Sequence, residues 1–455
     1  MNILVLNGSP KGKNSVTIQT SLYLEKRFNK HTFEILNVAQ KIRSFEKDMT
    51  SAMEAIEKAD LIIYSYPVYT FLVPYQLHRF IELMKENNVK LTDKYVTQIS
   101  TSKHFYDITA HKFIEENAYD MGARYIRGLS ADMEDLLEVK GQTQAVTFFE
   151  KVLFAIEKEI YTSKDLTKST GAREIYAPQL TGEETVKKSA EKDVLVVTNA
   201  AADDENLRNM IDDFKATCEY QVREVNIREY KFSGGCLGCM ECTATGSCIY
   251  KDGFPDFLRN NIQNADAIIY AYTIENHYTH SSFKCYDDRQ FCNGHRPVTK
   301  GMPVGYIISG DYESEHNVQT LVEGRTDVGG VYLCGIVTDE RDTTTEIKQL
   351  SDSLSYALTH QIDLPNMFYG VGGTKIFRDL VYKMQGMMQE DHKFYKKNGI
   401  YDFPQNNKLK ILQMKIIGMA ITNPKIKAKM PGTISQFIIQ PYTKLIDEAK
   451  PIEEK

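Results

Sequence analysis

Apolar runs alternate with helical stretches along most of the chain, and this pattern predicts a parallel sheet covered by helices on both faces. In the first part of the chain, the runs that resemble buried strands lie at 2–10, 32–36, 60–66, 94–100 and 123–129. Stretches with helical spacing separate or follow them at 16–28, 50–59, 75–85, 108–121 and 143–160. The fold class is therefore α/β.

The same pattern restarts near residue 193. The stretch ADAIIYAY at 265–272 repeats ADLIIYSY at 59–66 almost letter for letter. Further strands are expected at 193–201, 220–227, 303–310 and 330–337, with helices at 205–214 and 346–358. An internal repeat of this size predicts two copies of one domain.

These patterns predict four parts: a first domain at 1–162, a polar linker with one short helix at 163–191, a second domain at 192–362 and an extension at 363–455. The extension combines helical spacing with a basic excess that includes Lys408, Lys410 and Lys415. We favour a helical extension packed on the domains with its lysines in water over a helix lying on a membrane surface.

Composition narrows the class of protein. The chain has 455 residues, of which 42% are hydrophobic and 25% charged, as expected for a globular protein with more than one core. Its formal net charge of -6 gives no reason to expect nucleic acid as a partner. The sequence shows neither signal-peptide features nor an apolar run long enough for a transmembrane segment, so we expect a cytoplasmic protein. Clustered cysteines in that compartment indicate metal or redox chemistry.

The stretch NGSPKGKNS, 7–15, follows an expected strand and opens a helix. Gly8 permits a tight turn, Ser9, Asn14 and Ser15 offer short donors, and Lys11 adds a positive charge. A polar turn before a helix N-terminus is typical of a phosphate site. The pattern is neither a G-x-G-x-x-G fingerprint nor a Walker A motif. The alternative is an ordinary turn between a strand and a helix.

The longer stretch LVLNGSPKGKNS, 4–15, resembles the phosphate loop of the flavodoxin-like NADPH-dependent FMN reductase superfamily. YSYPVY at 64–69 and STSKHFY at 100–106 resemble its two further flavin loops. The resemblance implies two tandem, doubly wound, parallel five-stranded sheets, with FMN beyond the carboxyl ends of the first sheet's strands. The implied cofactor-binding residues are Ser9, Lys11, Asn14, Ser15, Tyr66, Pro67, Val68, Tyr69, Ser100, Thr101 and Ser102.

Half of the eight cysteines lie in one short loop of the second copy, in the pattern C-x2-C-x2-C-x5-C. They are Cys236, Cys239, Cys242 and Cys248. This spacing is too compact for a typical zinc ribbon and is close to that of iron–sulfur ligation. We favour an iron–sulfur cluster over structural thiols, zinc or a redox disulfide. We expect the dispersed Cys285, Cys292 and Cys334 to pack in the core.

The second copy resembles the iron–sulfur flavoprotein branch of the same superfamily, in which a compact cysteine loop follows the second strand. This resemblance implies a [4Fe-4S] cluster on the four loop cysteines. At the place of the phosphate loop, however, the second copy has TNAAADDENL, with Asp203, Asp204 and Glu205. Because acids repel phosphate, we expect no FMN in the second copy. His277 and His280 are weak candidates for proton donors, and the catalytic residues stay unknown.

The resemblance implies an oxidoreductase, a flavoprotein that passes electrons between FMN in the first half and the cluster in the second. The electron donor would be NAD(P)H or ferredoxin. The alternatives are an NAD(P)H-dependent FMN or quinone reductase with a vestigial cysteine loop, a flavodoxin-type electron carrier and a redox-sensing scaffold without flavin. Because members of the iron–sulfur branch act as dimers, a tandem chain is interpreted as a fused pair, and a further homodimer stays open.

Overall fold

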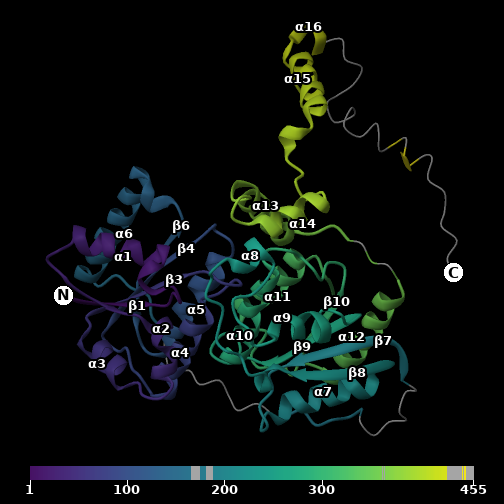
Figure 1. Cartoon of the computed structure of the whole chain (residues 1–455), viewed down its shortest axis with the longest axis horizontal. Coiled ribbons are helices and arrows are strands. Elements are labelled where there is room, and N and C mark those ends of the chain that lie inside the picture. The colour runs from purple at the N-terminus through teal and green to yellow at the C-terminus, as the bar shows by residue number, and fades with distance from the viewer. Residues whose placement is uncertain are drawn as a thin grey trace. The chain divides into compact units, whose positions relative to one another are not determined.

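The computed structural model of the protein describes residues 1–164, 175–180, 188–360, 362, 364–427, 443 and 445–446. Two parallel sheets with flanking helices form most of it (Figure 1). The predicted linker lies partly outside the described residues, and its predicted short helix is not found at 175–180. There, Gln179 and Leu180 donate backbone hydrogen bonds to Asp213 of the second domain. The predicted domain boundaries stay a prediction.

The first sheet has the strand order β2-β1-β3-β4-β5, and β6 also pairs with β4. Its strands are β1 (Asn2–Asn7), β2 (Thr32–Leu36), β3 (Leu61–Pro67), β4 (Tyr95–Ser102), β5 (Arg124–Tyr125) and β6 (Leu129–Asp132). All pair in parallel, in the doubly wound order in which ligands bind at the strands' carboxyl ends. The last predicted strand, 123–129, is divided into β5 and β6.

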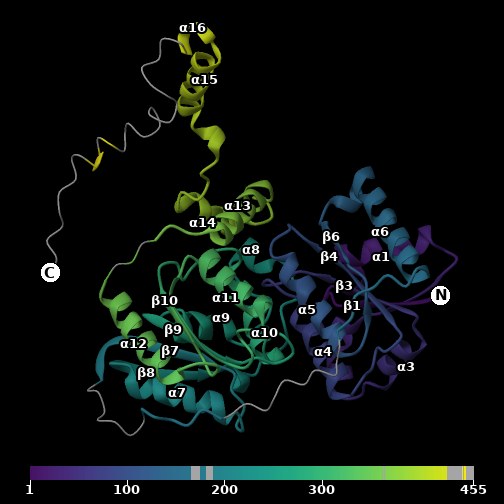
Figure 2. The same ribbon diagram turned by 180° about the vertical axis from the view of Figure 1, so that it is seen from behind.

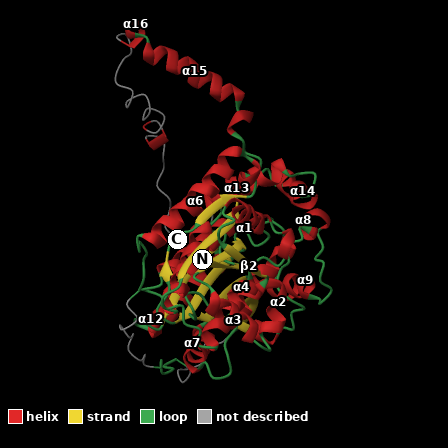
Figure 3. Ribbon diagram, turned by 90° about the vertical axis from the view of Figure 1, so that its left-hand side faces the viewer, coloured by secondary structure: helices red, strands yellow, loops and turns green. Residues whose placement is uncertain are grey.

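Side chains alternate between two apolar layers on either side of this sheet. Ile3 and Val5 pack against α1 (Val16–Arg27) and α6 (Val139–Glu157). Leu4 and Leu6 face the opposite layer. That layer contains α2 (Val38–Phe45), α3 (Thr50–Lys58), α4 (Tyr75–Glu86) and α5 (Asp107–Asp120). Figure 3 shows helices on both sides of the strands.

The second sheet has the order β11-β10-β9-β7-β8, which is the order of the first sheet read from its other edge. Its strands are β7 (Ser189–Thr198), β8 (Tyr220–Asn226), β9 (Ala267–Thr273), β10 (Pro303–Ser309) and β11 (Tyr332–Thr338). One face is covered by α7 (Glu205–Thr217) and α12 (Thr343–Thr359). The other is covered by α9 (Phe254–Phe257), α10 (Ser281–Arg289) and α11 (His316–Gly329). The predicted duplication is therefore confirmed.

Corresponding helices of the two domains pack against each other. In each copy one helix follows the third strand and another follows the fourth, and these are α4 and α5 in the first copy and α10 and α11 in the second. Helix α10 contacts α4, and α11 contacts α5. Tyr278 and Leu321 of the second copy belong to the apolar core of the first. The contact is thus self-complementary in the manner of a twofold dimer interface.

The C-terminal extension is helical, as predicted. It contains α13 (Phe368–Lys383), α14 (Gln389–Lys397), α15 (Lys408–Thr422) and α16 (Pro424–Lys427). Helix α13 packs on α11, and the Phe377 ring lies 4.2 Å from that of Phe105. The described residues from 396 onward belong to a separate compact unit, whose helices α15 and α16 are drawn in Figure 2. Leu409, Leu412 and Met419 of α15 are exposed. No helix among the described residues is long and apolar enough to cross a membrane.

Candidate cofactor site and cysteine loop

The predicted phosphate loop lies between the carboxyl end of β1 and the start of α1. The Gly8 amide donates to the Ser65 carbonyl at 2.8 Å, and a β-carbon at Gly8 would collide with Leu77. The Ser9 amide donates to the Asn7 side chain at 3.1 Å. These contacts fix the turn close to β3. Ser9 and Ser15 are buried, whereas Lys11 and Asn14 are exposed.

The loop leaves the start of α1 without a side-chain cap. Ser15 is the N-cap residue, and its side chain accepts no hydrogen bond from the helix. Lys11 forms no ion pair with any residue that the structure describes. An uncapped helix N-terminus beside a lysine and buried hydroxyls has the donors and the charge that a phosphate needs. The residues present therefore fit the terminal phosphate of FMN.

The second predicted loop, which we call the flavin loop (66–74), leaves β3. The Val68 amide donates to the Thr101 carbonyl at 3.2 Å, and Tyr69 and Leu72 exchange backbone hydrogen bonds of 2.8 and 2.9 Å. Thr70 and Phe71 have positive φ values of 41° and 71°. Left-handed backbone is unfavourable for residues of this shape, so surrounding contacts must hold the loop.

Those contacts come from the second domain. The buried Lys284 ammonium donates to the Tyr69 carbonyl at 3.0 Å and to Thr70 Oγ1 at 2.6 Å. Asp288, the ion-pair partner of Lys284, accepts from the Tyr75 amide at 2.8 Å. Burial lowers the pKa of Lys284, and the charge of Asp288 opposes that shift. The first domain's flavin loop is therefore held by a buried ion pair on α10.

Arg325 of α11 also holds the flavin loop, and we call Lys284, Asp288 and Arg325 the clamp. Its guanidinium donates to the Thr70 carbonyl at 3.1 Å and pairs with Asp287 at 2.8 Å. Together, Lys284, Asp288 and Arg325 bind Tyr69 and Thr70 of the flavin loop and Tyr75, the residue that follows it. None of the three was predicted from the sequence. The i,i+4 spacing of Lys284 and Asp288 was the available signal, because such pairs lie on one helix face.

The third predicted loop begins at the end of β4 and meets the other two. Thr101 Oγ1 lies 2.5 Å from Thr17 Oγ1 in the first turn of α1, and Ser102 Oγ accepts from the His104 amide at 2.8 Å. Ser100 Oγ lies 2.8 Å from His111 Nε2. The structure thus brings the three predicted loops together at one edge of the sheet.

Tyr66 differs from the other candidate flavin residues. Its ring is fully buried in the apolar core, and its hydroxyl donates to Gln98 Oε1 at 2.5 Å. Pro67 and Val68 are half-buried, and Tyr69 is buried against the second domain. Burial raises the pKa of the Tyr69 phenol, and the neighbouring Cys236 and Asp288 raise it further. Tyr69 therefore lies close to the predicted cluster ligands, whereas Tyr66 supports the sheet.

The cysteine loop (234–253) lies against the flavin and phosphate loops. A β-carbon at Gly238 would stand 1.8 Å from the Tyr69 hydroxyl and 3.3 Å from Lys11 Cε. Gly238 also has a positive φ of 61°, so glycine is required here for both backbone and space. The Gln76 side chain donates to the Cys236 carbonyl at 3.4 Å. The four-cysteine segment of the second copy therefore borders the candidate flavin site of the first.

The four loop cysteines are free thiols, and all but the exposed Cys239 are partly buried. The Gly238 amide donates to Cys236 Sγ at 3.4 Å, a type of contact that iron–sulfur sites use. Burial raises the pKa of Cys242 to about 11, and the neighbouring Cys239 and Cys248 contribute. No described group of three or more ligands is placed to hold a single metal ion. A [4Fe-4S] cluster takes one thiolate on each of four irons, and this loop supplies four free thiols.

The other cysteines lie outside the loop. Cys285 and Cys292 are buried, as expected, and Cys334 in β11 is half-buried. Burial raises the pKa of Cys292 to about 12, and the neighbouring thiols of Cys248 and Cys242 raise it too. Cys292 thus lies beside the cysteine loop without belonging to the predicted ligand set.

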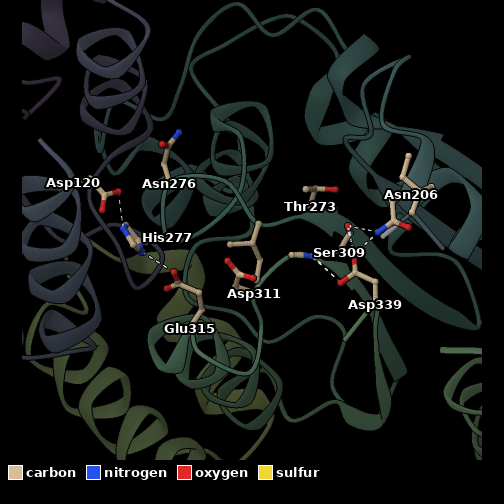
Figure 4. A pocket seen from close by; sticks show the side chains of 12 residues that line it. Asp120, Asn206, Thr273, Asn276, His277, Ser309, Asp311, Glu315 and Asp339 are labelled. Carbon is tan, nitrogen blue, oxygen red and sulfur yellow. Dashed lines mark hydrogen bonds and ion pairs between the residues drawn. The ribbon is translucent and has the colours of Figure 1, made fainter. Parts of the chain in front are cut away.

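The strand ends of the second copy form a pocket of about 460 Å³, shown in Figure 4. Asp204 caps α7 by accepting from the Leu207 amide, and it also accepts from the Thr273 hydroxyl at 2.7 Å. Asp339 accepts from Ser309 Oγ at 2.7 Å and from the Gly310 amide at 3.1 Å. The chain's own carboxylates therefore occupy donors at these strand ends, as expected if the second copy binds no FMN.

His277 joins the two domains beside this pocket. Its ring nitrogens lie 2.9 Å from Asp120 Oδ2 and 2.8 Å from Glu315 Oε1 (Figure 4). Burial opposes the charged ring, but the hydrogen bonds and charges of these two carboxylates outweigh it and raise the pKa of His277 to about 9. His280 caps α10 by accepting from the Ser282 amide. Both histidines thus have structural contacts.

The family model of the flavodoxin-like fold, Flavodoxin_2, matches residues 1–133. The first 133 residues are therefore similar to this family, in agreement with the resemblance of the three loops. The chain is similar to an iron-sulfur flavoprotein of Archaeoglobus fulgidus, with 25% identity over 189 residues, covering 40% of this chain and 85% of the relative.

Two solved structures are also similar. An NADH:FMN oxidoreductase in its apo form is 16% identical, covers 36% of this chain and 91% of its own, and has a TM-score of 0.31. An FMN-dependent NADH-azoreductase from Bacillus anthracis in complex with FMN is 16% identical, covers 35% and 99%, and has a TM-score of 0.26.

Proposed function

We propose that the protein is an FMN-dependent oxidoreductase in which the first domain binds FMN and the second domain holds a [4Fe-4S] cluster. The observation that carries this proposal is that Gly238 of the cysteine loop lies against Tyr69 of the flavin loop and Lys11 of the phosphate loop. The A. fulgidus relative bears the name iron-sulfur flavoprotein, which supports the same pairing. NAD(P)H or ferredoxin would serve as electron donor.

The first domain would hold FMN through the phosphate, flavin and third loops. Ser9, Asn14 and Ser15 would donate to the phosphate, and Lys11 would offset its charge. Pro67, Val68 and Tyr69 would border the flavin, with Thr101 and Ser102 on the adjoining loop. FMN supplies hydride acceptance and single-electron exchange when bound.

The second domain would hold the cluster through Cys236, Cys239, Cys242 and Cys248, and the cluster supplies one-electron transfer. The chain's own contribution is positioning. Lys284, Asp288 and Arg325 hold the flavin loop, and the Gly238 contact leaves no room for a side chain between that loop and the cysteine loop.

Anaerobic purification of the full chain, followed by an ultraviolet–visible spectrum and iron and flavin analysis, tests the proposal. Cys242→Ser should lose iron and keep FMN, because it removes one of four cluster ligands. The matched control Cys334→Ser, in β11, should keep both. Iron retained at the wild-type level by Cys242→Ser would contradict a cluster on this loop. Wild-type protein with flavin and no iron would instead support the reductase with a vestigial cysteine loop.

A further inference from the structure

A cavity of about 210 Å³ lies between the sheet and two helices of the second domain, where this domain meets the flavin loop, and no residue of the cysteine loop lines it. Strands β9 and β10 form one wall, and α10 and α11 form the other. Thr70 and Phe71 of the flavin loop also line it. Cavities of about 150 Å³ can bind benzene, so this volume admits one six-membered ring with one or two small substituents.

Aromatic rings line most of the cavity. The rings of Tyr272 and Phe283 are 5.1 Å apart at an interplanar angle of 60°, and those of Tyr270 and Tyr306 are 5.5 Å apart. Tyr278 adds a fifth ring, 6.1 Å from Tyr272. Because aromatic rings attract each other edge to face and in offset stacks, these walls favour an aromatic occupant over an aliphatic one.

Four tyrosines line the walls, and the hydroxyls of Tyr272 and Tyr306 form no hydrogen bond with a described residue. The Tyr272 side chain is 2% exposed and that of Tyr306 is 5% exposed. The Tyr278 hydroxyl donates to Asp287 at 2.6 Å. Because Tyr272 and Tyr306 line the cavity, their hydroxyls are placed to bond an oxygen atom of an occupant.

The charges around the cavity cancel. Arg325 lines it and forms an ion pair with the buried Asp287 at 2.8 Å. The guanidinium also lies 5.7 Å from the centre of the Phe71 ring and 5.4 Å from that of Tyr278. A second buried charge would cost more than this balanced pair could offset. The occupant is therefore expected to be neutral.

We propose that this cavity binds a neutral, one-ring aromatic molecule that carries an oxygen substituent, such as a phenol. The occupant would lie against the flavin loop, since Arg325 contacts both the cavity and the Thr70 carbonyl. The site is distinct from the FMN and cluster sites. Its test does not depend on either cofactor being bound.

Isothermal titration of the full chain with p-cresol tests the site. We expect saturable binding with a dissociation constant of about 1 mM or below, and weaker binding of toluene and cyclohexanol. Tyr272→Phe and Tyr306→Phe should each weaken p-cresol binding by roughly 3- to 10-fold and leave toluene unchanged, because only the hydroxyl is removed. Tyr312→Phe is the matched control, since Tyr312 is buried in the same domain and does not line the cavity.

A second variant fills the cavity without breaking a contact. Gly329 lines it at the end of α11, and a β-carbon there would meet only Val331 at 3.6 Å. Gly329→Leu should therefore fold and abolish p-cresol binding, whereas Gly372→Leu in α13 should bind as the wild type does. Absence of saturable p-cresol binding to the wild type, or binding that survives Gly329→Leu, would overturn the proposal.

Discussion

The first helix of each domain starts in a different way. Helix α1 has Ser15 at its N-cap with no side-chain hydrogen bond, whereas α7 has Asp204, which accepts from the Leu207 amide. The two junctions follow equivalent strands of equivalent sheets. One helix start thus has no side-chain cap, and the other is capped by the chain's own carboxylate. In a duplicated fold, a carboxylate of the chain can take the place at a helix N-terminus that a bound phosphate would otherwise occupy.

The two copies also depend on each other. The flavin loop of the first copy is held by Lys284, Asp288 and Arg325 of the second. The cysteine loop of the second copy borders the first copy's Tyr69 and Lys11. With corresponding helices packed together, the arrangement resembles a dimer fused into one chain. Fusion allows each copy to specialise, because both are always present in equal amounts.

The largest effect is expected from breaking the clamp on the flavin loop. Lys284→Met leaves Asp288 buried without its cation and should lower the free energy of unfolding by about 3–5 kcal/mol. Urea unfolding of the full chain measures it. Adding Asp288→Leu should recover part of the loss, since no unpaired charge then remains. A single variant as stable as the wild type would show that the two copies do not rely on this pair.

The next effect concerns the ion pairs of His277 with Asp120 and Glu315, which we call the bridge between the domains. Its contribution to stability depends on pH. Because the folded-state pKa of His277 is raised to about 9, its stabilisation is fully present below pH ~6.5 and is lost as the pH rises through about 9. The shift corresponds to at most about 3 kcal/mol.

Urea unfolding at pH 6 and pH 9.5 tests this bridge. His277→Gln should remove most of the difference between the two pH values that the bridge causes. The exposed His360 supplies the control, and His360→Gln should behave as the wild type does. Equal pH dependence in His277→Gln and the wild type would contradict a charged bridge.

A third test places at the N-cap of α1, Ser15, the aspartate that the second copy has at the N-cap of α7. Ser15→Asp should weaken FMN binding by roughly 100-fold, because a carboxylate would stand beside the phosphate. The fold should persist, since aspartate is a favourable N-cap residue. Quenching of FMN fluorescence measures the affinity, and the iron content should stay unchanged. Unaltered FMN affinity would place the phosphate elsewhere.

The smallest effect is expected at Asp204, the N-cap residue of the second copy that corresponds to Ser15 in the first. Asp204→Ala removes the cap of α7 and should lower the free energy of unfolding by about 1 kcal/mol. Flavin content should not change, because the second copy lacks the other FMN residues. A rise to two flavins per chain would show that Asp204 alone closes the second site.

The sequence predicted the elements that depend on local pattern. Buried strands such as β1, β3 and β9 are nearly continuous apolar runs, and their repetition predicted the duplication. Helix α2 was missed because it is only eight residues long. The apolar pattern alone did not predict α10, because most of its residues are buried polar or charged side chains, and only the resemblance to the family placed a helix there. Helix α11, although long, was missed as well.

The predicted candidate site was incomplete for a different reason. The strand–turn–helix motif predicted the phosphate loop, because its residues are contiguous. The clamp joins Thr70 to Lys284 and Arg325, more than 200 positions away, and no local pattern predicts such contacts. The bridge from Asp120 to His277 depends on the same domain contact. Tyr66 was predicted as a cofactor-binding residue from its place in the motif. Side chains alternate between the two faces of a strand, and that of Tyr66 points from β3 into the apolar core.

We propose that the two copies divide the cofactors, with FMN in the first and the cluster in the second. Flavin and iron quantitation of the full chain, purified without oxygen, distinguishes this division from its alternatives. We expect one FMN and four irons per chain. Two FMN molecules per chain, or no iron in protein that retains its flavin, would contradict it.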